Sequence, residues 1–163
     1  MGQASIVDFA AVGRVSKFVE LKDVRLVEVS AKCDPKATGP LEAEFAHQSA
    51  IAGRGEDSLE VTSDYSFIGK AAQVSVIEIK IKYLVVYEFK GRPVLEDGDV
   101  SQFAMANGTL HSWPFVRELL FGLTSRMGFP AFKLGVMHFV PQKPTEKPAE
   151  KVSSAENPAP VKS

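Results

Sequence analysis

The segment from Val74 to Lys90 constrains the fold more than any other part of this chain, because its polarity alternates with a period of two. From Ile77 onward one side of the segment is apolar or aromatic and consists of Ile77, Ile79, Ile81, Tyr83, Val85, Tyr87 and Phe89. The other side is mostly charged, although Leu84 and Val86 interrupt it. This alternation predicts a β-strand with one buried face. At about 3.3 Å per residue the strand would span roughly 55 Å, so we expect it to bend or to reach past its sheet.

Three other segments predict strands, over residues 15–31, 41–52 and 58–69. In the first, the alternation breaks near Asp23, where we expect a β-bulge or a bend. The residues expected to share one face in the other two are Leu41, Ala43, Phe45 and His47, and then Leu59, Val61, Ser63, Tyr65 and Phe67. Glycine and proline residues mark the turns and loops between these strands.

Helical patterns occur at residues 6–12 and 96–108, the latter with Asp97 or Asp99 as its N-terminal cap. A longer helix is predicted from Ser112, as the cap, through Pro114 in the first turn to Gly128, which suits the left-handed closing position. The chain then runs extended to residue 140. Half-buried strands followed by a helix predict an α+β fold with an antiparallel sheet.

The chain has 163 residues, 45% of them hydrophobic, which predicts one globular domain with a substantial core. The net charge of −1 excludes a strong electrostatic attraction to nucleic acid. The single cysteine, Cys33, fits a reducing compartment, and the first residues lack the pattern of a signal peptide, so we expect a cytoplasmic protein. No apolar run reaches the roughly 18–20 residues of a membrane span, so we expect no membrane insertion.

The sequence contains no motif for catalysis, metal binding or cofactor binding. The three histidines, His47, His111 and His138, lack metal-ligand spacing, and no Ser–His–Asp or Cys–His arrangement has local support. We therefore expect no catalytic residue, no metal and no cofactor, and hence no enzyme. One alternative stays open, because distant carboxylates could meet in space in a small-molecule-binding or enzymatic domain on a curved antiparallel sheet.

Residues 141–163 differ in composition from the rest of the chain, with five prolines, four lysines, three glutamates and no aromatic residue. Such a segment cannot bury enough apolar surface to offset the entropy of ordering it. We therefore predict a domain over residues 1–140 followed by a disordered tail.

The predicted long helix is apolar on more than one side, since Trp113, Phe115 and Phe121 are distributed around its apolar stripe. A helix that packs on a single sheet needs only one apolar side. The surplus predicts an oligomer interface, for which the candidate residues are Trp113, Val116, Leu119, Leu120 and Leu123.

The stretch QFAMANGTLHSWPFVRELLFGLTSRMGFPAFKL, residues 102–134, resembles the hallmark region of SecB chaperones. The matching features are Asn107 before a short turn, the aromatic-Pro-aromatic run at 113–115, the Arg-Glu pair at 117–118, an apolar helix, and Ser-Arg-x-Gly-x-Pro at 125–130. Upstream, the Lys-Asp pair at 22–23 resembles the first strand of the family. Each feature alone is weak, but their order and spacing together are specific.

The resemblance implies a four-stranded antiparallel sheet with a crossover, packed on a long helix, and a homotetramer built as a dimer of dimers with the helix between them. It also implies ATP-independent holding of unfolded polypeptides, which export-type members deliver as preproteins to the motor ATPase SecA for translocation. It places client binding near the strand at 74–90, where the candidate residues are Tyr83, Leu84, Val85, Val86, Tyr87 and Phe89.

The chain departs from the family in three respects. Family members have a second helix after the Gly-x-Pro segment, whereas this chain continues into a Pro/Lys/Glu-rich tail. Export-type members are strongly acidic, whereas this chain is almost neutral. Of the acidic positions implied to contact SecA, only Asp23 carries over, because Val27 occupies the next one. These departures suit the distant SecB-like proteins that serve toxin–antitoxin pairs at least as well as the export type.

Overall fold

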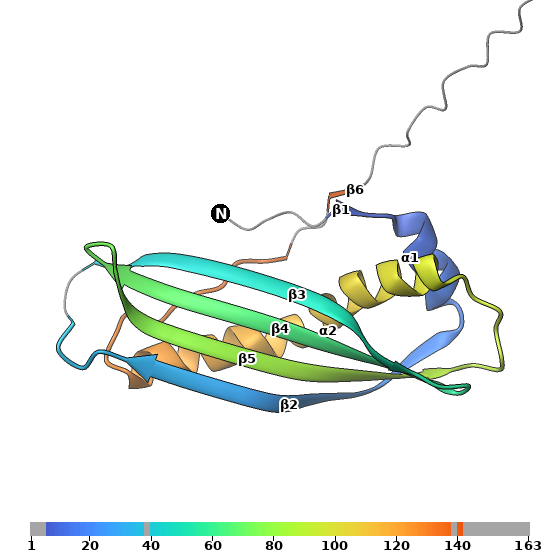
Figure 1. Ribbon diagram of the computed structural model, residues 1–163, viewed down its shortest axis with the longest axis horizontal. Helices are drawn as coiled ribbons and strands as arrows, with labels where there is room; N and C mark the ends of the chain where they lie inside the picture. Colours follow the sequence, from blue (N-terminus) through green and yellow to red (C-terminus); the bar gives the residue numbers. More distant parts are fainter. Residues whose placement is uncertain (1–5, 38–39, 138–139, 142–163) are drawn as a thin grey trace, which may run out of the picture.

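A four-stranded antiparallel sheet, in the order β2-β5-β4-β3, dominates the structure (Figure 1). The structure is a computed structural model that describes residues 6–37, 40–137 and 140–141. Its strands are β2 (Val19–Cys33), β3 (Glu42–Arg54), β4 (Ser58–Ala71) and β5 (Val74–Phe89). Because β2 and β3 are consecutive in sequence but lie at opposite edges, the chain crosses the sheet between them. The predicted α+β fold with a crossover is confirmed.

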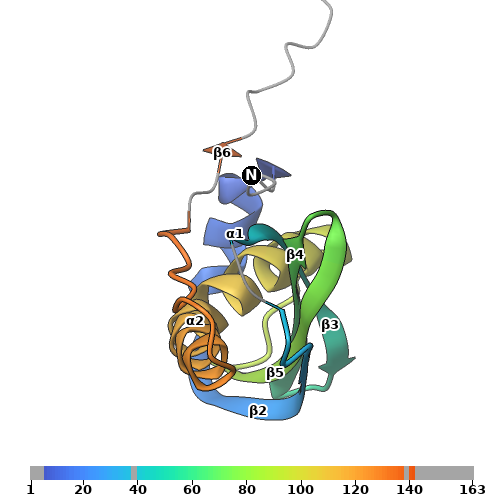
Figure 2. The same cartoon turned by 90° about the vertical axis from the view of Figure 1, so that its left-hand side faces the viewer.

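One long helix, α2 (Asp97–Arg126), runs along a single face of the sheet, and α1 (Phe9–Ser16) packs against it (Figure 2). The helix expected at residues 6–12 begins later, because the Asp8 carboxylate caps it by accepting hydrogen bonds from the N–H groups of Ala10 and Ala11. The preceding residues form β1 (Ile6–Val7), which pairs in parallel with β6 (Val140–Pro141). We call the sheet face opposite α2 the open face.

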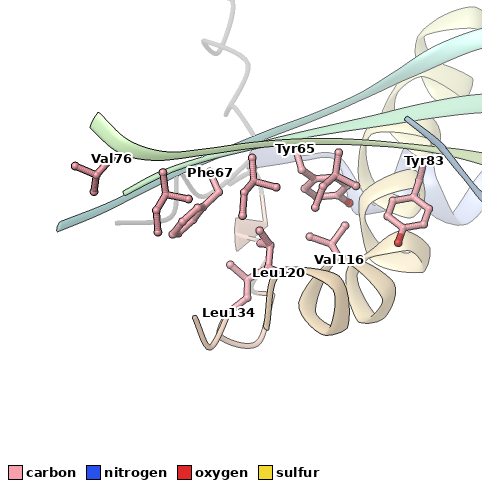
Figure 3. Close-up of a cluster of buried hydrophobic side chains, with 10 residues drawn as sticks. Tyr65, Phe67, Val76, Tyr83, Val116, Leu120 and Leu134 are labelled. Carbon is pink, nitrogen blue, oxygen red and sulfur yellow. The ribbon is translucent and has the colours of Figure 1, made fainter. Parts of the chain in front are cut away.

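The core lies between the sheet and α2. β4 and β5 are the two central strands, and their register places Tyr65 opposite Ile81 and Phe67 opposite Ile79. These side chains pack with Val116 and Leu120 of α2 (Figure 3). The predicted apolar faces of both strands are therefore confirmed as the buried faces, and β5 is a single strand of 16 residues, as its long alternation indicates.

The broken alternation of β2 has a simple structural cause. Its pairing with β5 shifts register between Leu21 and Asp23 and again between Leu26 and Glu28. Each shift inserts one extra residue, as in a β-bulge, so the apolar residues that follow return to the face that carries α2. The irregularity predicted near Asp23 is confirmed, and the second bulge, at Val27, lies beyond it.

The prediction of two separate helices over residues 96–127 is wrong, because α2 is one helix of 30 residues with Pro114 in its interior. Ser112 does not cap a helix; its hydroxyl donates to the carbonyl oxygen of Gly108 inside α2. Gly108 was interpreted as part of a turn, but it lies where α2 passes so close to β4 that an added Cβ would be 2.5 Å from Val61. Pro114 removes one helical hydrogen bond, and packing of both halves of α2 against the same sheet compensates for that loss.

Asp97 and Asp99 also do not cap α2. The N-terminal cap is Glu96, whose side chain makes no capping hydrogen bond, and both aspartates lie in the first turn, where Asp97 contacts Arg54 and Asp99 contacts Arg14. Negative charge in a first turn is favourable because the N-terminal end of a helix is electropositive.

The end of α2 matches its prediction. Gly128 adopts a φ of +83°, the left-handed conformation in which glycine is favoured, and its N–H donates to the carbonyl of Ser125. Residues 129–137, which we call the strap, then return along α2 without forming a helix or a strand, as the sequence predicts. The predicted disordered tail falls, apart from Pro141, outside the described residues.

Candidate functional site

The residues expected to bind clients do not form one surface. Tyr83, Val85, Tyr87 and Phe89 are at most 7% exposed, and all four belong to the core between the sheet and α2. A client cannot reach them without displacing α2. The expectation that these four residues contact a client directly is therefore corrected. Their alternation identifies a face of β5 that is covered by its own subunit. Leu84 and Val86 lie half-buried on the open face, where a partner can still reach them.

The expected interface residues of α2 also divide into two groups. Val116 and Leu120 have no exposed surface, because they face the sheet. They therefore stabilise the subunit itself, and the expectation that they contact another subunit is corrected. Leu119 and Leu123 pack partly against the same core. Trp113 lies over β3 and β4, with its ring 5.7 Å from Phe45 and 6.2 Å from Tyr65.

An apolar surface that the sequence did not single out lies along β2. Leu21, Leu26 and Val29 are opposite the buried residues Tyr87, Tyr83 and Ile81 of β5, so they point to the face that carries α2. They nevertheless remain 41–45% exposed, because α2 packs mainly over the other half of the sheet.

Phe115 of α2 extends this surface across the face. It is 45% exposed, and its ring lies 6.1 Å from that of Tyr83, the strand partner of Leu26. We call Leu21, Leu26, Val29 and Phe115 the β2–α2 surface. The signal for it in the sequence is the spacing of the β2 apolar residues, which follows one face only when both bulges are counted.

The side of α2 that faces away from the sheet carries a second apolar set. Leu110 and Phe121 are each 47% exposed, and Pro114 lies between them on the same side. Arg117 also lies there, since residues at 110, 114, 117 and 121 follow helical spacing. This outer side, rather than Val116 and Leu120, is the part of α2 that is available for contact with another subunit.

The open face is polar and balanced in charge. Lys82 and Asp64 form an ion pair at 3.3 Å on neighbouring strands, and Lys22 and Glu88 form another. A shallow pocket of about 350 Å³ crosses this region, with Glu28, Asp64, Lys80 and Lys82 among its lining residues. Cations and anions thus alternate here, so the face does not present a continuous acidic surface.

Asp23, the candidate SecA contact, lies on this face opposite Val86. Its carboxylate pairs with the Arg25 guanidinium, and that hydrogen bond lowers the pKa of Asp23 below its ordinary value. The negative charge of Asp23 is therefore partly neutralised by a neighbour in the same strand.

Hydroxyl groups fill the closest contact between α2 and the sheet. The hydroxyl of Ser49 lies 2.7 Å from those of both Ser63 and Thr109, and the Tyr65 hydroxyl lies 2.7 Å from that of Ser112. Burial raises the pKa of Tyr65 to about 12, so this hydroxyl stays protonated and available as a donor at neutral pH. In the described ranges no buried side-chain polar atom lacks a partner. The network therefore fixes α2 on β3 and β4.

Two histidines are half-buried, His111 on α2 and His47 on β3. The Tyr87 hydroxyl and Nδ1 of His111 lie 2.8 Å apart, and His47 packs against Trp113. Burial lowers the pKa of both imidazoles, so both favour the neutral form. Among the described residues no group of three or more His, Cys, Asp or Glu side chains could hold a metal ion.

No family model and no curated protein sequence matches this chain. Among solved structures, the SecB-like chaperone Rv1957 of Mycobacterium tuberculosis, in complex with a ChAD peptide from the antitoxin HigA1, is similar with a TM-score of 0.70. The match has 16% sequence identity and covers 78% of this chain and 97% of that chain. The chain has the SecB-like fold. A protein of unknown function from Streptococcus agalactiae also matches, at 15% identity over 72% of this chain and 97% of that chain, with a TM-score of 0.44.

Within the SecB-like fold, the hallmark stretch at residues 102–134 forms most of α2 and the first two thirds of the strap. The strap occupies the place in the sequence where the family resemblance implies a second helix. None of the helices in the described ranges is long and apolar enough to span a membrane.

Proposed function

We propose that this protein is an ATP-independent molecular chaperone, a holdase that binds unfolded polypeptides in the cytoplasm without catalysing a reaction. The observation that carries the proposal is the β2–α2 surface, where Leu21, Leu26, Val29 and Phe115 are exposed beside an edge strand. Exposed apolar side chains that gather on one surface are typical of binding sites. The SecB-like fold supports the same conclusion.

The arrangement suits an extended, unfolded client. β2 pairs only with β5 among the described strands, so the backbone groups on its outer side are free to pair with another chain. A client strand would gain main-chain hydrogen bonds at this edge and would bury alternate side chains against Leu26 and Val29. Each aliphatic or aromatic side chain that becomes buried adds about 1.5–3 kcal/mol before ordering costs. Several such contacts without a closed pocket favour clients of varied sequence.

We further propose a homo-oligomer, a tetramer, whose subunits meet through the outer side of α2. Leu110 and Phe121 are the exposed apolar residues of that side. This proposal replaces the expected contact through Val116 and Leu120 and retains partial contributions from Trp113, Leu119 and Leu123.

The client class that we favour is an antitoxin of a toxin–antitoxin pair. The solved SecB-like chaperone binds a peptide from an antitoxin, and the open face here is balanced in charge rather than acidic. Preproteins delivered to SecA for export are the other class implied by the resemblance. For that class Asp23 is the one candidate contact, and Arg25 pairs with it.

The test is the aggregation of a chemically unfolded client, followed by light scattering in the absence of nucleotide. The wild-type protein should suppress aggregation, and Leu26→Ser with Val29→Ser should suppress it at least about tenfold less effectively, since 1.4 kcal/mol corresponds to tenfold in binding. The matched control is Val74→Ser with Val94→Ser, which removes two exposed aliphatic side chains outside the β2–α2 surface. Failure of the wild-type protein to slow the aggregation of any client would contradict the proposal.

A further inference from the structure

The strap, residues 129–137, is bound to its own subunit in the manner of an extended peptide. It leaves the end of α2 and runs back beside that helix towards β1 and β6 (Figures 1 and 2). It begins with a hydrogen bond from the N–H of Phe129 to the carbonyl of Thr124. From there it lies against the side of α2 opposite the β2–α2 surface.

Two apolar side chains, two residues apart, anchor the strap. The Phe132 ring lies 4.5 Å from that of Phe67 on β4, and Leu134 is only 8% exposed within the core cluster. Lys133, between them, is exposed. Over residues 132–134 the strap thus inserts alternate side chains, as an extended segment does, whereas Val136, the next such position, is 71% exposed.

Side chains of α2 rather than a strand ladder hold the backbone of the strap. The N–H of Phe132 donates to the Thr124 hydroxyl at 2.9 Å, and the Trp113 indole N–H donates to the carbonyl of Gly135 at 3.0 Å. From Pro130 to Met137 the strap makes no backbone–backbone hydrogen bond to any other described residue. A segment with few backbone bonds and two anchors opens more readily than a strand inside a sheet.

A hollow lies beside the bound strap. It has a volume of about 380 Å³ and lies between Pro114 and Phe121 of α2 and Phe132 and Leu134 of the strap. The strap thus leaves apolar surface of α2 uncovered along its own length.

We propose that the strap is a resident ligand of a second polypeptide-binding site, formed by Phe67 of β4, Trp113 and Thr124 of α2, and the core surface beneath Leu134. The ligand class is an extended polypeptide with apolar side chains at alternate positions, and such a ligand displaces the strap when it binds. The proposal deepens the chaperone function, on which it rests: one client-binding surface is always open along β2, and the other opens only by competition.

The test uses a fluorescein-labelled synthetic peptide with the sequence of residues 128–137 and the full-length protein. A tethered segment competes at an effective concentration on the order of millimolar, so loss of its anchors should tighten peptide binding by at least about tenfold. The variant is Phe132→Ser with Leu134→Ser, and the matched control is Lys133→Ser, which changes an exposed residue between the two anchors. Equal affinity of the peptide for wild type and double variant, or no binding to the double variant, overturns the proposal.

A second measurement keeps the test decisive if the double variant fails to fold. Amide hydrogen exchange is measured on the wild-type protein with and without a saturating unfolded client. Faster exchange of the Phe132 amide, which donates to the Thr124 hydroxyl, with β4 unchanged, supports displacement of the strap, and unchanged exchange of that amide contradicts it. The single tryptophan, Trp113, provides a parallel fluorescence signal because its indole N–H contacts the strap.

The two proposals fail separately. Suppression of aggregation without a strap-dependent change in peptide binding leaves the holdase standing and removes the second site. If peptide binding depends on the strap but the protein suppresses the aggregation of no client, the second site stands and the holdase proposal fails.

Discussion

Substitution of Gly108 by alanine tests how α2 is seated on the sheet. An ideal Cβ at this position would lie 2.5 Å from Cγ1 of Val61 and 3.1 Å from both the Ser49 Cβ and the Ser63 hydroxyl oxygen. Val61 is fully buried on a central strand and is β-branched, so it has little freedom to move aside. The helix must therefore shift away from β4, which also stretches the hydroxyl network of Ser49 and Thr109.

Gly122→Ala is the matched control, because Gly122 is also inside α2 and its added Cβ would meet only the Arg126 side chain, at 3.6 Å. Both variants gain the same helix propensity, about 1 kcal/mol for Gly to Ala. Their difference in unfolding free energy therefore isolates the overpacking cost, about 1–3 kcal/mol. For a chain of 163 residues that difference corresponds to a Tm roughly 2–12 °C lower for Gly108→Ala than for Gly122→Ala.

The assay is thermal unfolding of both variants, followed by circular dichroism at one protein concentration. A Gly108→Ala protein that melts at or above the temperature of Gly122→Ala would refute the close contact between α2 and β4.

Three further predictions concern stability and assembly. Burial lowers the folded-state pKa of His111 and His47, so the unfolded chain binds more protons once the pH falls below the ordinary histidine value of about 6.5, and stability should decline from there towards the folded-state pKa values. His111→Gln, which does not titrate, should reduce the loss in Tm between pH 7.5 and 5.5, and an unchanged loss would contradict this assignment. Leu120→Asp should abolish cooperative unfolding, because a charge without a partner in the core costs several kcal/mol. Phe121→Asp should instead leave the subunit folded and dissociate the oligomer in light scattering, and the same result for both variants would contradict the assignment of Leu120 to the core and of Phe121 to the exposed side of α2. Deletion of residues 142–163 should leave the Tm within about 2 °C, since segments of this composition rarely pack, and a larger fall would show that they do.

The central strands could be predicted from the sequence because each has one face against α2 and one face open. Val61, Tyr65 and Phe67 of β4 alternate with polar residues for this reason, and β5 behaves in the same way. The alternation of polar and apolar residues shows that one face of a strand is apolar, but it does not show what covers that face. Tyr83 and Tyr87 were therefore assigned to clients, although α2 covers them.

The helix was misread for a related reason. Gly108 and Pro114 give the same sequence pattern whether they end a helix or lie within it and serve its packing. Only the position of Val61, distant in sequence, explains why residue 108 lacks a side chain. Leu26 and Val29 were missed because their side chains do not differ in type from core residues, and their exposure depends on where α2 lies over the sheet.

The most direct test of the chaperone account is the binding of a fluorescently labelled, permanently unfolded polypeptide, measured by anisotropy without nucleotide on two variants that differ in the face they alter. Leu26→Ser with Phe115→Ser removes two exposed apolar side chains from the β2–α2 surface, and Leu84→Ser with Val86→Ser removes two half-buried apolar side chains from the open face. The account predicts that the first variant raises the Kd by at least about tenfold, equivalent to about 1.4 kcal/mol, while the second leaves it within about twofold. A loss of affinity confined to the second variant would place clients on the open face, and no binding by the wild-type protein would contradict the chaperone function itself.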